Sequence, residues 1–117
     1  GIDKSPADAR RTPKVQITEN IIKFGPVKHN APQQQRTFTL TNTGDGELIV
    51  RAVETGGKVA TTLTPGQRIP AGSSFTAKAT LDPGRQEYGV VTDFVTIITN
   101  DPTRPMRRLR ATAIVED

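Results

Sequence analysis

The chain contains no cysteine and no tryptophan, and it has one histidine, one tyrosine and one methionine among its 117 residues. The absence of cysteine excludes disulfides, thiolate metal sites and a thiol nucleophile. The lone His29 lies in a polar segment without the partners that a catalytic triad or a metal site needs, so we interpret it as an ordinary surface residue. No apolar run approaches the roughly 20 residues that cross a bilayer, so no membrane span is expected in this segment.

Other signatures of chemistry are also missing from the sequence. The glycines form neither a GxGxxG pattern nor a Walker loop, which disfavours nucleotide binding. No Asp-x-Asp-x-Asp calcium loop occurs, and no nucleophile has a base nearby in the sequence. We therefore expect neither an enzyme nor a cofactor.

The residues that are abundant favour strands. There are 17 threonines, 9 valines and 9 isoleucines against 5 leucines, and 10 glycines and 9 prolines divide them into short segments. Side chains branched at Cβ suit strands better than helices. The length fits one domain, and the net charge of +4 is mild. This composition predicts a single all-β domain with many turns.

The first 14 residues differ from the rest. They contain two prolines, several charges and few apolar side chains, which is typical of a linker. Gly1 is interpreted as the remnant of a cleaved tag. We expect residues 1–14 to be tag remnant and interdomain linker, and residues 15–117 to be the folded domain.

Beyond residue 14, apolar and polar residues alternate with the period of a strand. The first strand is expected to be kinked, and the change of parity between Val50 and Val53 predicts a bulge or a strand end. Phe24, Phe38 and Phe75 are expected to fill much of the core. No segment has the apolar spacing of an amphipathic helix. The predicted fold is an immunoglobulin-like β-sandwich of about seven antiparallel strands without a disulfide, at residues 15–24, 36–42, 48–53, 59–63, 73–81, 90–99 and 106–115.

Three motifs at their spacing resemble a known family: Ile22-x-Phe24-Gly25-x-Val27, Phe38-x-Leu40-x-Asn42-Thr43-Gly44-Asp45 and Ile97-x-Thr99-Asn100-Asp101-Pro102. Over residues 15–115 the chain resembles the bacterial Ig-like domain-of-unknown-function family 1573. That family is related to the Ig-like modules of Hydin and abnormal-spindle proteins and, distantly, to major sperm protein. The resemblance implies modules that often occur in tandem in exported bacterial proteins, in the periplasm or at the cell surface, without known activity or cofactor.

One departure from the family pattern affects function. Many bacterial relatives carry a Cys-Gly-Cys motif after the third strand, where this chain has Thr55-Gly56-Gly57-Lys58-Val59. Gly56 and Lys58 stand where the cysteines would be. A metal or redox role of those cysteines therefore does not carry over.

The candidate binding residues are four arginines near the last strand: Arg104, Arg107, Arg108 and Arg110. They suggest an anionic partner, such as nucleic acid or another anionic polymer, or else a solvated outer face. Asp93, inside an apolar strand, is interpreted as an outward-facing residue or an edge guard, with a binding role as the alternative. If Ile49, Phe94 and Ile98 point outward, they form an exposed apolar patch that favours a protein interface. The leading hypothesis is a non-enzymatic structural or interaction module of a multi-domain exported protein, with a protein or a neighbouring domain as partner.

Overall fold

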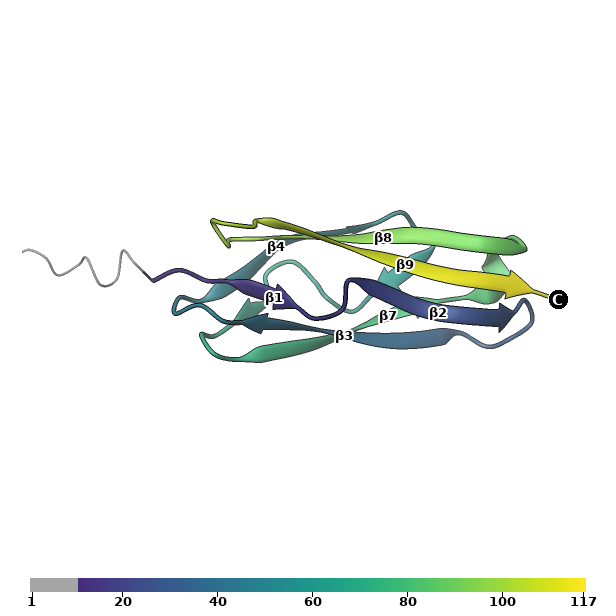
Figure 1. The fold of residues 1–117 in the computed structure, drawn as a ribbon, viewed down its shortest axis with the longest axis horizontal. Helices are drawn as coiled ribbons and strands as arrows, with labels where there is room; N and C mark the ends of the chain where they lie inside the picture. Colours follow the sequence, from purple (N-terminus) through teal and green to yellow (C-terminus); the bar gives the residue numbers. More distant parts are fainter. Residues whose placement is uncertain (1–10) are drawn as a thin grey trace, which may run out of the picture.

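A computed structural model describes residues 11–117 of the chain (Figure 1). Those residues form nine strands and one short 3-10 turn, η1. Their bounds are β1 Val15–Ile17, β2 Ile21–Lys28, β3 Gln34–Asn42, β4 Leu48–Thr55, β5 Val59–Thr61, β6 Arg68–Ile69, β7 Ser74–Leu81, η1 Pro83–Arg85, β8 Gly89–Thr99 and β9 Met106–Glu116. The all-β prediction is confirmed. The strand number exceeds seven because the first predicted strand is divided into β1 and β2, and because β6 was not predicted.

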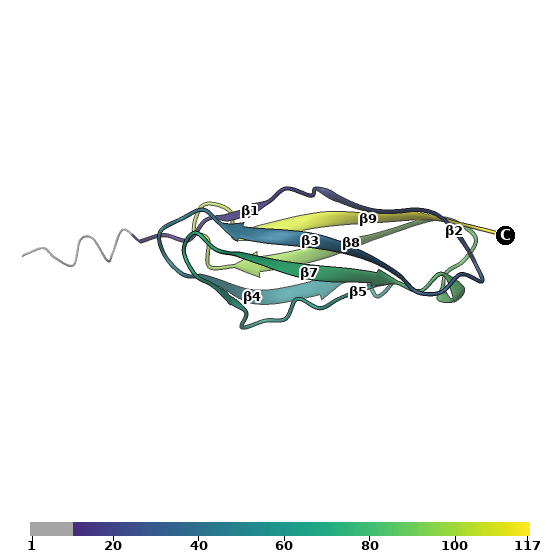
Figure 2. The same cartoon turned by 90° about the horizontal axis from the view of Figure 1, so that it is seen from below.

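The strands form two packed sheets, which Figure 2 shows from a second direction. One sheet has the order β1-β3-β7-β5 and the other the order β2-β9-β8-β4-β6. The predicted immunoglobulin-like sandwich is therefore confirmed. The predicted irregularity near Val50 is also present, as a register shift in the pairing of β4 with β8.

The core lies between the two inner faces. Strand alternation directs every second side chain inward, so Phe38 and Leu40 of β3 are completely buried, as is Val95 of β8. Phe24 is buried as predicted, whereas Phe75 is only half-buried and packs against the margin of the core. The other large apolar side chains that are fully buried are Leu48, Val50, Ile69, Leu81, Pro83, Ile97, Leu109 and Val115.

The first part of the domain changes sheets. β1 pairs antiparallel with β3, and after a short crossing β2 pairs parallel with β9. Gly25, with a φ of 72°, lies at the register shift within β2, where a left-handed conformation favours glycine. The strand pairs are antiparallel, as predicted, except for this pair of β2 with β9, which is parallel. After leaving β1, the chain continues in the same direction into the second sheet, and β9 runs in that direction too (Figure 1).

The Asn-Thr-Gly motif has a structural role. The side chain of Asn42 is fully buried, and its amide nitrogen donates to the carbonyls of Gly46 (2.7 Å) and Ile69 (2.9 Å). Its amide oxygen accepts from the backbone N–H groups of Lys14 (3.2 Å) and Gly44 (3.0 Å). Since every polar group of the side chain has a partner, Asn42 joins three loops at one end of the sandwich at little desolvation cost.

The segment before β1 also contacts this end. Pro13 is buried, and Thr12 and Asp45 exchange hydrogen bonds: the backbone N–H of Thr12 donates to Asp45 Oδ1 at 2.7 Å, and the backbone N–H of Asp45 donates to the Thr12 carbonyl at 3.1 Å. Residues 12–14, grouped above with the linker, thus hydrogen-bond the turn between β3 and β4. The rest of the predicted linker, residues 1–10, lies outside the described residues.

Candidate functional site

The outer face of the five-stranded sheet carries most of the exposed large apolar side chains of the described residues. Six large apolar side chains of residues 11–117 are exposed, and all except Tyr88 lie on β2, β8 or β9: Ile21, Val90, Phe94, Met106 and Ile114. The register places Val90 opposite Ile114 and Phe94 opposite Arg110, which is itself opposite Ile21. These residues therefore share one side of adjacent strands. We call this surface the outer apolar face.

The opposite surface of the sandwich is polar. On the outer side of β3 and β7, Thr39 lies opposite Thr76, and Thr41 lies opposite Ser74. Their hydroxyl groups are 3.1 Å and 2.9 Å apart, which joins the two strands by side-chain hydrogen bonds. The two outer surfaces therefore differ in chemistry, and only the outer apolar face resembles a binding surface.

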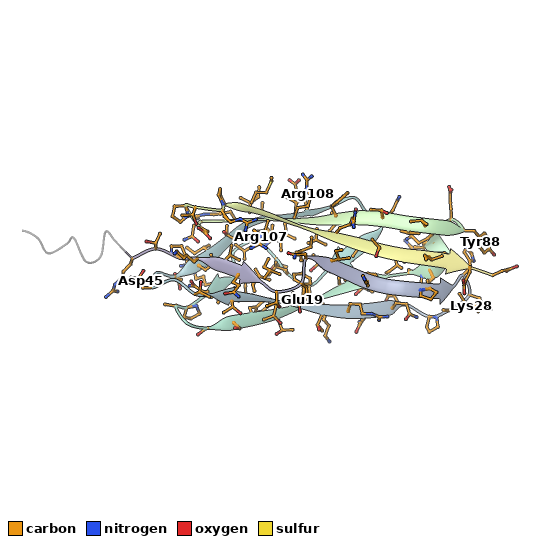
Figure 3. The ribbon with its side chains drawn as sticks, viewed as in Figure 1. Glu19, Lys28, Asp45, Tyr88, Arg107 and Arg108 are labelled. Carbon is orange, nitrogen blue, oxygen red and sulfur yellow. The ribbon has the colours of Figure 1, made fainter. Side chains whose placement is uncertain are left out.

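Two of the predicted arginines belong to the outer apolar face. Arg108 and Arg110 are exposed, and the guanidinium carbon of Arg108 lies 5.5 Å from the centre of the Phe94 ring. Figure 3 shows Arg108 directed away from the sandwich. A guanidinium over an aromatic ring combines cation–π attraction with apolar contact, so this pair gives the face a basic centre. Phe94 points outward, as the hypothesis of a protein interface requires, and Ile98 is half-buried on the same side.

The other two arginines lie elsewhere. Arg107 alternates with Arg108 along β9, so its side chain points toward the seam between the two sheets, and Arg104 lies in the loop before β9. Both line a cleft of about 410 Å³ beside β1, which we call the seam cleft. Figure 3 labels Arg107. The structure therefore divides the predicted arginine group into two pairs, rather than joining all four on one surface.

Asp101, in the same loop, is buried and closes the inner end of the seam cleft. Its Oδ2 accepts the backbone N–H of Val15 at 2.9 Å. Its Oδ1 accepts the hydroxyl (2.8 Å) and backbone N–H (2.9 Å) of Thr103 and the backbone N–H of Arg104 (3.2 Å). Burial opposes ionisation, but these hydrogen bonds outweigh it and hold the pKa of Asp101 below its ordinary value.

Arg107 has a different environment. Burial and the neighbouring charge of Arg104 lower the pKa of the Arg107 guanidinium, while the Asp101 carboxylate opposes this effect. The ion pairs of the described residues join Arg68 to Glu47 and Arg85 to Asp82, so Arg107 belongs to neither. A half-buried guanidinium without an ion-pair partner is unusual, because charged groups lose hydration on burial.

The interpretation of Asp93 as an outward-facing residue or edge guard is wrong. Asp93 is 5% exposed and points inward, where Oδ1 accepts from the backbone of Gly56 (2.8 Å) and Phe94 (2.7 Å). Oδ2 accepts from the backbone of Lys58 (3.0 Å) and Val59 (3.0 Å). The carboxylate thus fixes the loop between β4 and β5. The sequence indicated the inward direction of the Asp93 side chain, because Asp93 alternates in step with the inward-pointing Val91 and Val95.

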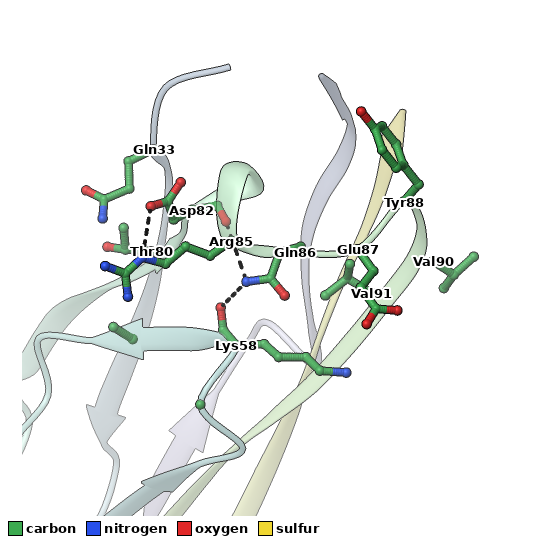
Figure 4. Close-up of a pocket in the computed structure, with 12 residues that line it drawn as sticks. Gln33, Lys58, Thr80, Asp82, Arg85, Gln86, Glu87, Tyr88, Val90 and Val91 are labelled. Carbon is green, nitrogen blue, oxygen red and sulfur yellow. Dashed lines mark hydrogen bonds and ion pairs between the residues drawn. The ribbon is translucent and has the colours of Figure 1, made fainter. Parts of the chain in front are cut away.

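A second hollow, of about 1100 Å³, opens at the far end of the domain between β5 and the start of β8 (Figure 4). Gln86 crosses its wall and donates to the carbonyl of Lys58 at 3.4 Å. Nearby, the ring of His29 stacks on that of Tyr88, with ring centres 4.7 Å apart. Nε2 of His29 lies 3.1 Å from the carbonyl oxygen of Gln86. His29 therefore has a structural contact. The hollow combines charges of both signs with no arrangement of nucleophile and base.

Residues 11–117 contain no group of three or more His, Asp or Glu side chains placed to hold a metal ion. Within the same range, no helix has the length and apolar character needed to cross a membrane.

Comparison with known families gives one match. The family described as "Protein of unknown function (DUF1573)" matches residues 15–115. No curated protein matches the chain.

Solved structures share the fold at low sequence identity. A protein of unknown function from Porphyromonas gingivalis W83 has a TM-score of 0.78 at 22% identity, covering 97% of this chain and 52% of that one. The chain therefore spans about half the length of that relative. The ASH/PapD-like domain 7 of human CEP192 has a TM-score of 0.73 at 13% identity, with coverage of 99% and 91%. The periplasmic chaperone SfaE has a TM-score of 0.65 at 11% identity, with coverage of 89% and 59%.

Proposed function

The chain belongs to the DUF1573 family, and we propose that it is a non-enzymatic protein-interaction module that binds its partner through the outer apolar face. One observation supports this proposal above the others: five of the six exposed large apolar side chains of the described residues lie on one side of β2, β8 and β9. Monomeric soluble proteins rarely leave such side chains adjacent on one surface, and larger exposed patches mark interaction sites.

The charges of this face indicate the partner's chemistry. Lys23 on β2 and Arg108 and Arg110 on β9 are exposed on the same side, with Glu54 of β4 at the margin opposite Thr96. We propose a partner surface that is largely apolar and carries an acidic group facing the Arg108–Phe94 pair. Arginine and aromatic residues are enriched at interfaces, and the Arg108–Phe94 pair supplies both at the centre of the face.

The cellular setting is also proposed. The resemblance to exported bacterial modules and the likeness to a periplasmic chaperone support a location outside the cytoplasm, within a longer chain that carries further domains. Partners in that setting are proteins of the envelope or neighbouring domains of the same chain. An anionic polymer is the weaker alternative, because the structure places only two of the four predicted arginines on this face.

A capture experiment tests the proposal. The immobilised domain is incubated with envelope extract of the source organism and washed at low salt and at about 1 M salt, where charge interactions between exposed groups are strongly screened. A Phe94→Ser/Met106→Ser variant is compared with a Thr39→Ala/Thr76→Ala variant of the polar face. We expect a protein that resists high salt, is lost with the first variant and is retained by the second. Capture that high salt abolishes, and that depends on Arg108 and Arg110 alone, would instead support an anionic polymer.

A further inference from the structure

The last strand has an unpaired half. β2 pairs with β9 from Arg110 onward, and the backbone N–H of Arg110 donates to the carbonyl of Asn20. On its other side, β9 pairs with β8 along its whole length down to Met106, and the Pro105 carbonyl accepts the N–H of Thr99. Because backbone groups alternate along a strand, the N–H and C=O of Met106 and Arg108 point to the same side as those of Arg110. Among the described residues, no strand lies beside them there.

Two of the edge strands, β2 and β5, are protected by side chains. At the edge of β2, the guanidinium of Arg36 donates to the carbonyls of Lys23 (3.1 Å) and Phe24 (3.2 Å). At the start of β5, the Asp93 carboxylate accepts the N–H of Val59. Exposed edges invite pairing with other chains, and proteins commonly cover them. The half of β9 before Arg110 has no comparable protection.

The seam cleft adjoins this unpaired half. It is lined by Val15, Gln16 and Ile17 of β1 on one side and by Arg104 and Arg107 on the other. Figure 3 shows Arg107 in the space between β1 and β9. Neither arginine forms an ion pair with a described residue. The charge of the nearby Asp101 carboxylate acts on Arg107, but the two side chains form no ion pair, and the carboxylate accepts four hydrogen bonds from other groups.

We propose that the half of β9 from Met106 to Leu109 binds an extended peptide segment by strand addition, and that Arg107 and Arg104 bind a carboxylate side chain of that segment in the seam cleft. Main-chain hydrogen bonds would supply affinity, and the paired guanidinium groups would select an acidic residue. Side chains of the bound peptide would also alternate in direction, which predicts where the residues next to the acidic one point. If the acidic residue points into the cleft, the residues on either side of it point outward, next to the exposed Met106.

This site shares Met106 and Arg108 with the outer apolar face but uses the backbone edge of β9 and the seam cleft, so a test with a peptide and Arg107 separates it from the proposed function. The probe is the peptide acetyl-Thr-Val-Glu-Val-Thr-Val-amide, titrated into the whole chain and followed by the NMR signals of backbone amides. Two control peptides replace Glu by Gln or carry N-methyl groups on the two Val residues that flank Glu. Two variants of the protein, Arg107→Gln and Arg51→Gln, remove an arginine from the cleft and from an exposed position of β4 outside both proposed sites, respectively.

We expect the peptide to shift the amide signals of Met106 and Arg108 and to slow their hydrogen exchange. Replacing Glu in the peptide, or Arg107 in the protein, should weaken binding about tenfold or more, since a charge-assisted hydrogen bond is lost. N-methylation should abolish binding, and Arg51→Gln should change it little. The peptide controls on the unchanged protein suffice if Arg107→Gln fails to fold. Absence of these shifts, or binding that tolerates the Gln peptide or N-methylation, would overturn the proposal.

Discussion

The carboxylate of Asp101 accepts the backbone N–H of Val15 at 2.9 Å, across 86 positions of the sequence. This bond fixes the start of the first strand to the loop before the last strand, at the seam where the chain begins its change of sheets. The same carboxylate also holds the turn through Thr103 and Arg104. Asp101 therefore shapes the cleft beside which β9 is unpaired.

Substituting Asn for Asp101 should destabilise the domain. Asn keeps the shape of the side chain, but its amide nitrogen cannot accept the N–H groups that one of the carboxylate oxygens now receives. We expect the free energy of unfolding to fall by about 1–3 kcal/mol in urea denaturation. Glu87→Gln, at an exposed position, is the control and should change stability by less than about 0.5 kcal/mol. Equal effects of the two substitutions would contradict the role of Asp101.

The stability difference between the wild type and Asp101→Asn should depend on pH. The pKa of Asp101 is lower in the folded chain than its ordinary value of 3.8, so the unfolded chain binds its proton more readily. The stability that the Asp101 carboxylate contributes is complete well above its pKa in the unfolded chain. It is lost as the pH falls through the lower pKa of Asp101 in the folded chain. Denaturation at about pH 7, 5, 4 and 3 should show the difference shrinking at the acidic end. A difference that is constant or grows on acidification would contradict this assignment.

Gly56 should not tolerate a side chain. A Cβ atom at this position would overlap Asp93 Oδ1, which accepts the Gly56 N–H at 2.8 Å. Gly56→Ala should therefore lower the free energy of unfolding by about 1–3 kcal/mol. Gly84→Ala is the matched control, because a Cβ there meets atoms no closer than 3.5 Å and the residue has no left-handed backbone. Calorimetry of both variants checks the prediction, which fails if Gly56→Ala is the more stable of the two.

The phenylalanines should differ in their contribution to the core. Phe38 is completely buried, so Phe38→Ala should cost about 3–5 kcal/mol and could unfold the domain. Phe75 is only half-buried, so Phe75→Ala should cost clearly less. Chemical denaturation of the two variants measures the difference. Equal losses would show that Phe75 contributes to the core as fully as the sequence pattern alone suggested.

The sequence predicted the sandwich because its apolar residues alternate so regularly. Phe38 and Leu40, for example, lie on one side of β3 and are both buried. Alternation within one strand does not state which neighbour that strand takes. The change of sheets between β1 and β2, and with it the unpaired half of β9, was therefore not predictable. Arg107 and Arg108 are neighbours in the sequence, but side chains alternate along β9, so these two point to opposite sides of the strand. The inward direction of Asp93 was readable from its parity with Val91 and was misinterpreted because Asp is rarely buried.

The most direct test of the outer apolar face is site-specific photo-crosslinking in cells of the source organism. A photoreactive phenylalanine analogue is placed at exposed Thr92, opposite Thr112 on this face, or at exposed Thr76 on the polar face. The account predicts one discrete protein adduct from position 92 that disappears with Phe94→Ser, and none from position 76. No adduct at position 92, or the same adduct from both positions, would contradict it.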